Sequence, residues 1–243
     1  MKAVILSAGV GSRLHPYSIN FPKCLVKVGE DEMLKWQLKS LTFFNFKEII
    51  IVVGYKSKMV RDFVEKNFPG ENIRFVENSK YLTTSNLYSL KLGLSYVNNK
   101  KVLILNGDLV FNRKIISLFL NSGYENSVAV VNRVCDEEDM KVRITPAQKT
   151  DSFNYNRITE ISKTISLQDS DGQALGIYKI KDTQLLKKLL NQIEESNYFN
   201  EAINRMTNIV PIYAVDITRF PSIEIDFPED LKKANELFKT KDI

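Results

Sequence analysis

Residues 2–14, KAVILSAGVGSRL, place a short aliphatic run directly before a glycine-rich turn. The run Lys2–Ser7 is typical of a buried strand, and similar runs return at Glu48–Gly54 and Lys101–Asn106. Between them, Asp31–Phe44 repeats leucine with the spacing of one apolar helical face. Continuous Val/Ile/Leu strands that alternate with helices indicate a parallel sheet covered on both faces. We therefore predict an α/β fold with a doubly wound, mostly parallel, Rossmann-like sheet.

The second half of the chain follows a different pattern. From Ser127 to Ile180, apolar stretches follow one another with little helix between them, which indicates antiparallel strands. The further predicted strands are 73–76, 127–134, 140–145, 157–161, 173–180 and 209–215, and the further predicted helices are 57–68, 85–97, 183–196, 201–206 and 228–238. We expect Ser57 to cap the first of these helices and the polar segment Gln148–Asn156 to be a mobile loop. No linker or repeat divides the chain, so we predict one domain over residues 1–243 with a small antiparallel sub-region.

The composition excludes several classes of protein. The 243 residues include 34 basic and 29 acidic side chains, a net charge of +5 that is scattered rather than clustered. A negatively charged partner fits this excess, but no basic cluster interleaved with aromatics points to nucleic acid. No stretch approaches the roughly 18–20 apolar residues that span a membrane, and the apolar run before Gly9 is too short for a signal peptide. Cys24 and Cys135 with one histidine cannot form a His/Cys zinc cluster, so we expect a cytoplasmic protein with reduced thiols.

The turn after the first strand is the expected ligand site, because open α/β sheets bind ligands beyond the carboxyl ends of their strands. Gly9 and Gly11 would let backbone N–H groups approach phosphate oxygens closely. The dinucleotide fingerprint needs a third glycine where Leu14 stands, and the P-loop pattern also fails. Taken alone, the two glycines are explained equally well by a tight turn at the end of a strand.

The wider loop is more specific. Residues 6–26, LSAGVGSRLHPYSINFPKCLV, resemble the signature loop of the sugar-nucleotide and cytidylyl transferases, with matches at Gly9, Gly11, Arg13, Leu14, Pro16, Pro22, Lys23 and Leu25. A nucleoside triphosphate carries about four negative charges. The planar guanidinium of Arg13 can bind phosphate oxygens in pairs, and the ammonium of Lys23 can neutralise one charge. The resemblance implies that Arg13 and Lys23 are catalytic and that Ala8, Gly9 and Gly11 bind the nucleotide. It also implies a nucleotide-binding half (1–126), an acceptor-binding and closing half (127–243), and no room for an appended domain.

The resemblance further implies a metal site. Asp108 follows the strand that ends at Asn106, and Asp226 lies in SIEIDFP (222–228), which resembles the closing motif of cytidylyltransferases. We expect these two carboxylates to hold Mg²⁺, a hard cation that takes one or two carboxylates besides phosphates and waters. The alternatives are that Asp108 caps a turn and that Asp226 belongs to the N-cap region of the helix that starts at Pro228.

Other segments resemble base and acceptor sites. The run NSKYLTTSNL (78–87), with Thr84, Ser85 and Asn86, resembles the base-side segment of cytidylyltransferases, and Tyr55 matches a residue flanking their base pocket. N-capping alone would also explain Ser85 or Thr84. The missing glutamine-rich or P-x-G motif of sugar-phosphate members favours CTP. The expected acceptor-binding residues are Lys163, Gly176 and Glu201; Lys163 lacks the proline of the usual E-K-P motif and could equally be a solvated surface lysine.

These expectations define a reaction. An oxygen of a phosphorylated or phosphonate acceptor would attack the α-phosphorus of CTP in line and release pyrophosphate, with Mg²⁺ as cofactor. The alternatives are a sugar-1-phosphate uridylyl- or thymidylyltransferase and a nucleotide-binding module without catalysis. We expect a monomer or homodimer that binds neither nucleic acid nor membrane. The sequence does not name the acceptor.

Overall fold

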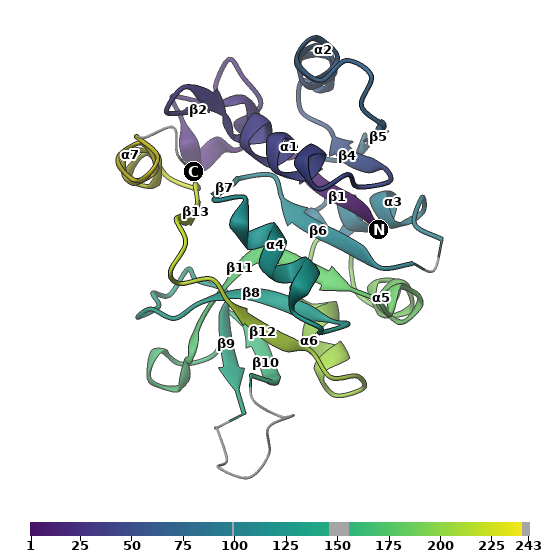
Figure 1. Cartoon of the computed structure of the whole chain (residues 1–243), viewed down its shortest axis with the longest axis vertical. Coiled ribbons are helices and arrows are strands. Elements are labelled where there is room, and N and C mark those ends of the chain that lie inside the picture. Colours follow the sequence, from purple (N-terminus) through teal and green to yellow (C-terminus); the bar gives the residue numbers. More distant parts are fainter. Residues whose placement is uncertain (99, 146–155, 240–243) are drawn as a thin grey trace.

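The fold is centred on one mixed sheet (Figure 1). The computed structural model describes residues 1–98, 100–145 and 156–239. Within these residues the main sheet has nine strands. Seven follow the order β10-β9-β11-β6-β1-β4-β5, β8 also pairs with β11, and β12 pairs with β8. The strands are β1 (Lys2–Ser7), β4 (Ile49–Val53), β5 (Ile73–Glu77), β6 (Val102–Asn106), β8 (Ser127–Val131), β9 (Lys141–Ile144), β10 (Ile158–Ser162), β11 (Gly172–Ile180) and β12 (Tyr213–Asp216).

Strand β1 lies between two parallel neighbours, β4 and β6. Their registers pair Ser7 with Val53 and Leu6 with Asn106, so the three strands end at one edge of the sheet. Strand β11 is antiparallel to β6, β8 and β9. Both the doubly wound parallel half and the antiparallel extension predicted from the sequence are thus confirmed.

Helices cover both faces of the sheet, as the alternation along β1 requires. Val4 and Leu6 face the core formed with α3, α5 and α6, whereas Ala3 and Ile5 face the core formed with α1, α2 and α4. The helices are α1 (Met33–Phe43), α2 (Ser57–Asn67), α3 (Asn86–Leu94), α4 (Lys114–Asn121), α5 (Thr183–Leu190), α6 (Asn200–Thr207) and α7 (Pro228–Leu237). None of the helices in the described ranges combines the length and the apolar character needed to cross a bilayer.

Two small two-stranded ribbons beside the main sheet were not predicted. Strand β7 (Leu109–Phe111) pairs antiparallel with β13 (Ser222–Glu224), and β2 (Lys27–Val28) pairs with β3 (Asp31–Glu32). Helix α7 packs near them on a third apolar cluster, which consists of Leu14, Val26, Val28, Met33, Val110, Ile225, Leu231, Ala234 and Phe238. This cluster fastens the glycine-rich loop to the ribbon that precedes α7.

Several boundaries differ from the prediction. Ser57 is the first residue of α2 rather than its cap, because Lys56 takes the N-cap position in the left-handed region (φ 48°). Helix α4 was missed, α5 ends at Leu190 instead of residue 196, and β12 starts at Tyr213 instead of residue 209. Of the polar segment predicted as a loop, residues 148–155 lie outside the described residues.

Gly93 of α3 provides a test of the helix–sheet packing. A Cβ at this position would lie 2.7 Å from Cγ1 of Val4 and 3.1 Å from Cγ2 of Val52. Alanine improves helix propensity by about 1 kcal/mol, but overpacking costs about 1–3 kcal/mol. We expect Gly93→Ala to lower the free energy of unfolding in urea by about 1–2 kcal/mol, whereas Glu65→Ala on the exposed face of α2 changes it by less than about 0.5 kcal/mol. An increase in stability for Gly93→Ala would contradict this packing.

Candidate nucleotidyl-transfer site

The glycine-rich loop is shaped by a close approach between two of its parts. Gly11 has φ +71°, and a Cβ there would lie 2.7 Å from the Cβ of Lys23. Glycine therefore permits both the left-handed backbone and the passage of the lysine side chain. Leu14 is fully buried in the third apolar cluster and anchors the loop there.

Lys23 lies between two carboxylates. Its Nζ is 2.8 Å from Oδ2 of Asp108 and 2.6 Å from Oδ1 of Asp226, and Nη2 of Arg13 is 2.9 Å from the same Asp226 oxygen. Burial alone would lower the pKa of Lys23, but the two carboxylates outweigh it and hold the pKa above its usual value. Burial likewise would raise the pKa of Asp226, but Lys23 and then Arg13 hold it below its usual range. Lys23 and Asp226 are thus both ionised near neutral pH.

The β7–β13 ribbon brings the two aspartates together. Glu224 pairs with Leu109, and the N–H of Ile225 donates to the carbonyl of Asp108 at 3.0 Å. The chain therefore places Asp226, 203 positions away from Lys23 in sequence, next to the loop that carries Asp108. The N-cap residue of α7 is Phe227, and the carboxylate of Asp230 in the first turn accepts from the N–H groups of Asp226 and Phe227 at 3.1 and 2.9 Å.

The two aspartates fit a divalent cation. Oδ1 of Asp108 is buried and has no hydrogen-bond partner among the described residues, while Oδ2 and the Asp226 carboxylate converge on the position of the Lys23 ammonium. Hard oxygen donors suit Mg²⁺, which keeps several waters or phosphate oxygens as its other ligands. The described residues hold no group of three or more His, Cys, Asp or Glu side chains able to bind a metal, so a cation here would depend on two carboxylates and on what a ligand brings.

A cavity of about 470 Å³ opens from this cluster along the ends of β1 and β6. Most of the predicted nucleotide-binding residues line it, namely Ala8, Gly9, Gly11, Thr84, Ser85 and Asn86. Tyr55 does not: its hydroxyl donates to the carbonyl of Ile19 at 3.1 Å, and its ring faces Tyr81, which does line the cavity. Asn78, the first residue of the predicted base-side run, also lines the cavity; it is buried, and its amide donates to Ser89 at 3.1 Å.

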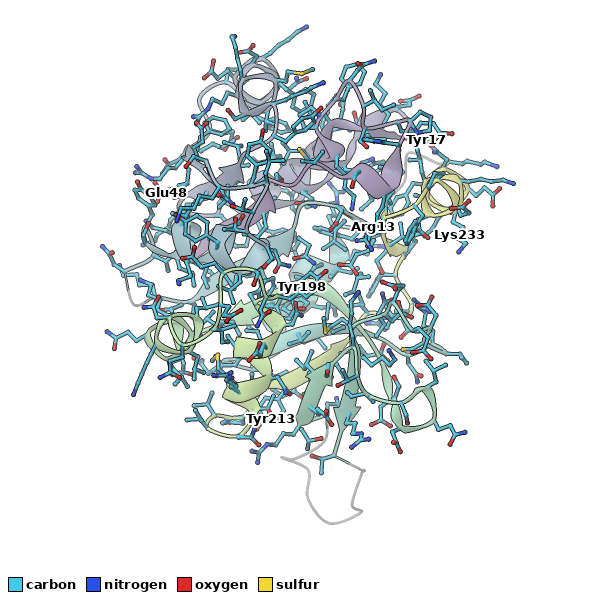
Figure 2. The ribbon with its side chains drawn as sticks, turned by 180° about the vertical axis from the view of Figure 1, so that it is seen from behind. Arg13, Tyr17, Glu48, Tyr198, Tyr213 and Lys233 are labelled. Atoms are coloured by element: carbon cyan, nitrogen blue, oxygen red, sulfur yellow. The ribbon has the colours of Figure 1, made fainter. Side chains whose placement is uncertain are left out.

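The start of α3 is tied to a distant segment. Ser85 accepts from the N–H of Leu87 at 3.2 Å, which is the N-cap interaction, and also donates to the carbonyl of Asn197. The amide oxygen of Asn86 accepts from the N–H of Phe199 at 3.2 Å. These bonds hold Tyr198 in the wall of the cavity. In Figure 2, Arg13 and Tyr198 lie in the middle of the molecule, between its glycine-loop part and its antiparallel part.

A second cavity, of about 520 Å³, adjoins the first. Among the described residues, those that line both are Arg13, Asn86, Asn106, Asp108, Tyr198 and Asp226. Of the predicted acceptor-binding residues, Lys163 and Gly176 line the second cavity. Glu201 lines neither, because its carboxylate bonds to Arg205 and to the Asn197 amide.

The comparison with known proteins assigns the family. Residues 3–201 match the model described as the MobA-like NTP transferase domain. The chain belongs to this NTP transferase family. It is 26% identical over 250 residues to the choline-phosphate cytidylyltransferase of Streptococcus pneumoniae, covering 99% of this chain and 100% of that protein. The CTP:phosphoglutamine cytidylyltransferase of Campylobacter jejuni is 25% identical over 74% of this chain and 72% of its own length.

A solved structure agrees with the fold of this NTP transferase. The inositol-1-phosphate CTP transferase from T. maritima superposes with a TM-score of 0.81 at 22% identity, covering 99% of this chain and 96% of that one. The predicted fold class and the resemblance to nucleotidyltransferases are both confirmed.

One carboxylate of this NTP transferase was not predicted as a site residue. Glu224 lines the second cavity beside Gly176, where a Cβ would lie 2.8 Å from Oε1 of Glu224. The amide of Asn106 donates to that oxygen at 3.0 Å. Burial, with the negative charge of Asp108, raises the pKa of Glu224 to about 8. This carboxyl group therefore carries a proton at neutral pH in the folded protein.

The raised pKa makes folding stability depend on pH. Between the ordinary pKa of 4.5 and about 8, the folded state holds a proton on Glu224 that the unfolded chain releases. The free energy of unfolding therefore loses a contribution as pH rises through this window. We expect the stability of Glu224→Gln relative to the unsubstituted protein, measured by urea unfolding in EDTA, to increase steadily from pH 5 to pH 8. A difference that stays constant over this range would show that Glu224 titrates normally.

Proposed function

We propose that this NTP transferase transfers the cytidylyl group of CTP to a small phosphorylated or phosphonate acceptor and releases pyrophosphate. The observation that carries the proposal is the junction of two cavities at Arg13, Asp108 and Asp226. A nucleotide in the first cavity and an acceptor in the second would meet where cations and carboxylates are concentrated. The relatives named as cytidylyltransferases, including one matched over its whole length, support CTP as donor.

The side chains at this junction suit an in-line displacement. An acceptor oxygen attacks the α-phosphorus, the bond to the β-phosphate oxygen breaks, and pyrophosphate leaves with the electron pair. Lys23 neutralises the charge on the α-phosphate, and the planar guanidinium of Arg13 donates hydrogen bonds to the leaving phosphates. Both cations are held at this junction by Asp108 and Asp226 before a substrate arrives.

A divalent cation completes this proposal. We infer that Asp108 and Asp226 hold Mg²⁺, which when bound would neutralise the charge on the leaving pyrophosphate. The buried, unpartnered Oδ1 of Asp108 supports this assignment. We propose that the enzyme works in the cytoplasm as a monomer or homodimer, consistent with its two free buried cysteines and its CTP donor.

The polar wall of the first cavity supports recognition of a pyrimidine base. Asn78, Thr84, Ser85 and Asn86 present amide and hydroxyl groups that can pair with the donor and acceptor edge of cytosine. Asn78 is fixed through Thr84 and Ser89 at 3.2 and 3.1 Å, so its orientation is set before a base binds.

A pyrophosphate-release screen tests the donor and acceptor classes. The four nucleoside triphosphates are each combined with choline phosphate, a phosphonate, a polyol phosphate and a sugar 1-phosphate, with MgCl₂ or with EDTA. We expect release with CTP, dependence on a divalent cation, and little release without an acceptor. A preference for UTP or dTTP with a sugar 1-phosphate would replace the proposal by the sugar-nucleotide alternative. CTP binding without release in any combination would indicate a non-catalytic module.

Lys23 should be indispensable for turnover. We expect Lys23→Ala to reduce kcat with CTP by about 10²–10³-fold or more, because a charge aimed at the reacting phosphate is lost. Lys27→Ala, which removes a nearby exposed lysine, is the matched control and should retain turnover. Circular dichroism of both variants checks that the fold survives. Turnover of Lys23→Ala within threefold of the parent would contradict the assigned role.

A further inference from the structure

Lys141, the first residue of β9, is a lysine with no exposed surface. In the described structure, its ammonium donates to three main-chain carbonyls: those of Glu137 at 3.3 Å, Asp139 at 3.3 Å and Lys163 at 2.8 Å. An ammonium has three N–H donors, so these acceptors match its capacity. A buried charge is costly unless it is satisfied in this way.

The three carbonyls belong to two separate segments of the second cavity. Glu137 and Asp139 flank Glu138, which lines that cavity, and the third carbonyl is that of Lys163 itself. Inside the cavity, Nζ of Lys163 is 3.2 Å from Oε2 of Glu138, and Nη1 of Arg13 is 3.9 Å from the same oxygen. The buried Lys141 ammonium therefore links the two backbone segments that carry Glu138 and Lys163.

The β9–β10 pairing joins the two segments as far as Lys141 and Ser162, and the Lys141 ammonium extends this link to residues 137–139 and 163. Two further contacts in this region act differently. Asp139 accepts from Arg133 and from the N–H of Asp136, both at 2.7 Å, which stabilises the loop internally. The Glu138–Lys163 ion pair does cross between the segments, but the Glu138 side chain is 68% exposed. An exposed ion pair contributes little and yields readily to another charge. The buried link through Lys141 stays in place when a ligand displaces that ion pair.

We propose that Lys141 is a positioning residue for the acceptor: it fixes the spacing between Glu138 and Lys163, so that Lys163 can leave Glu138 and meet an acceptor phosphate or phosphonate without its backbone moving. This inference rests on the proposed function in one respect, namely that the second cavity binds the acceptor.

The kinetic test compares two buried lysines. Lys141→Met removes the ammonium and keeps an unbranched chain of similar length. Lys179→Met is the matched control, because Lys179 is also buried, with its ammonium bonded to the carbonyl of Phe119 and to Ser122, and lines neither cavity. With the acceptor found in the screen, we expect Lys141→Met to raise the acceptor KM about tenfold or more while kcat and the CTP KM stay within about threefold. The control should leave all three constants within about threefold.

Equal effects on the acceptor KM and the CTP KM, or an unchanged acceptor KM, would overturn the proposal. Lys141→Arg, which retains the charge, should recover part of the acceptor affinity. If Lys141→Met does not fold, Lys141→Gln takes its place, because its amide can still donate to two of the carbonyls.

Hydrogen–deuterium exchange separates this proposal from the proposed function. Lys141→Met should accelerate exchange of the amides in 136–140 and 163–165, and Lys179→Met should not. If the unsubstituted protein releases no pyrophosphate with any acceptor, the proposed function fails, and the exchange experiment still decides whether Lys141 orders the two segments. Unchanged exchange in both segments would refute the positioning role whatever the activity.

Discussion

The site depends on one ammonium group held between two carboxylates. Asp108 and Asp226 come from segments far apart in sequence, and without a cation between them their charges would repel across a partly buried space. Lys23 removes that repulsion and at the same time fastens the glycine-rich loop to the β7–β13 ribbon. The loop, the ribbon and α7 share one apolar cluster, so ion pairing and burial stabilise the same arrangement.

This arrangement makes ligand binding an exchange of ion pairs rather than a simple addition of charge. In the described structure, Arg13 and Lys23 are paired with carboxylates, and Lys163 is paired with Glu138. Phosphates that arrive with a divalent cation would supply a negative partner to the basic groups and a positive partner to the acidic ones. The net charge of +5 has little bearing on this process, because the relevant charges nearly cancel within the site.

Much of the fold was accessible from the sequence because β1, β4 and β6 are long aliphatic runs with helices of clear periodicity between them. The position of Asp108 followed from the same reasoning, since it comes directly after a buried strand. Its partner Asp226 required a family motif, because β7 and β13 have three residues each and too short a pattern to predict a pairing.

Tertiary contacts explain the residues that sequence reasoning misplaced or missed. Glu201 follows the cavity-lining Asn200 in sequence, and Tyr55 matches a family motif, but Arg205 and Ile19 engage their polar groups instead. Glu224 and Lys141 stand in strands, where charged residues are ordinarily expected to face solvent. Only the packing of the second half around β11 shows that Lys141 is buried and that Glu224 is half-buried.

The distance in sequence between Lys23 and Asp226 has a consequence for synthesis on the ribosome. The strands β1, β4 and β6 and the helices α1 to α4 all precede residue 127, so this half can begin to form while later residues, including α5 and α6, are still being added. Asp226, just after β13, is added 118 residues after Asp108, and β11, which extends the sheet beyond β6, is added in between. A nascent chain would therefore carry the glycine-rich loop and its lysine well before it gained the second aspartate, and this cluster of charges would remain incomplete until the ribbon had formed.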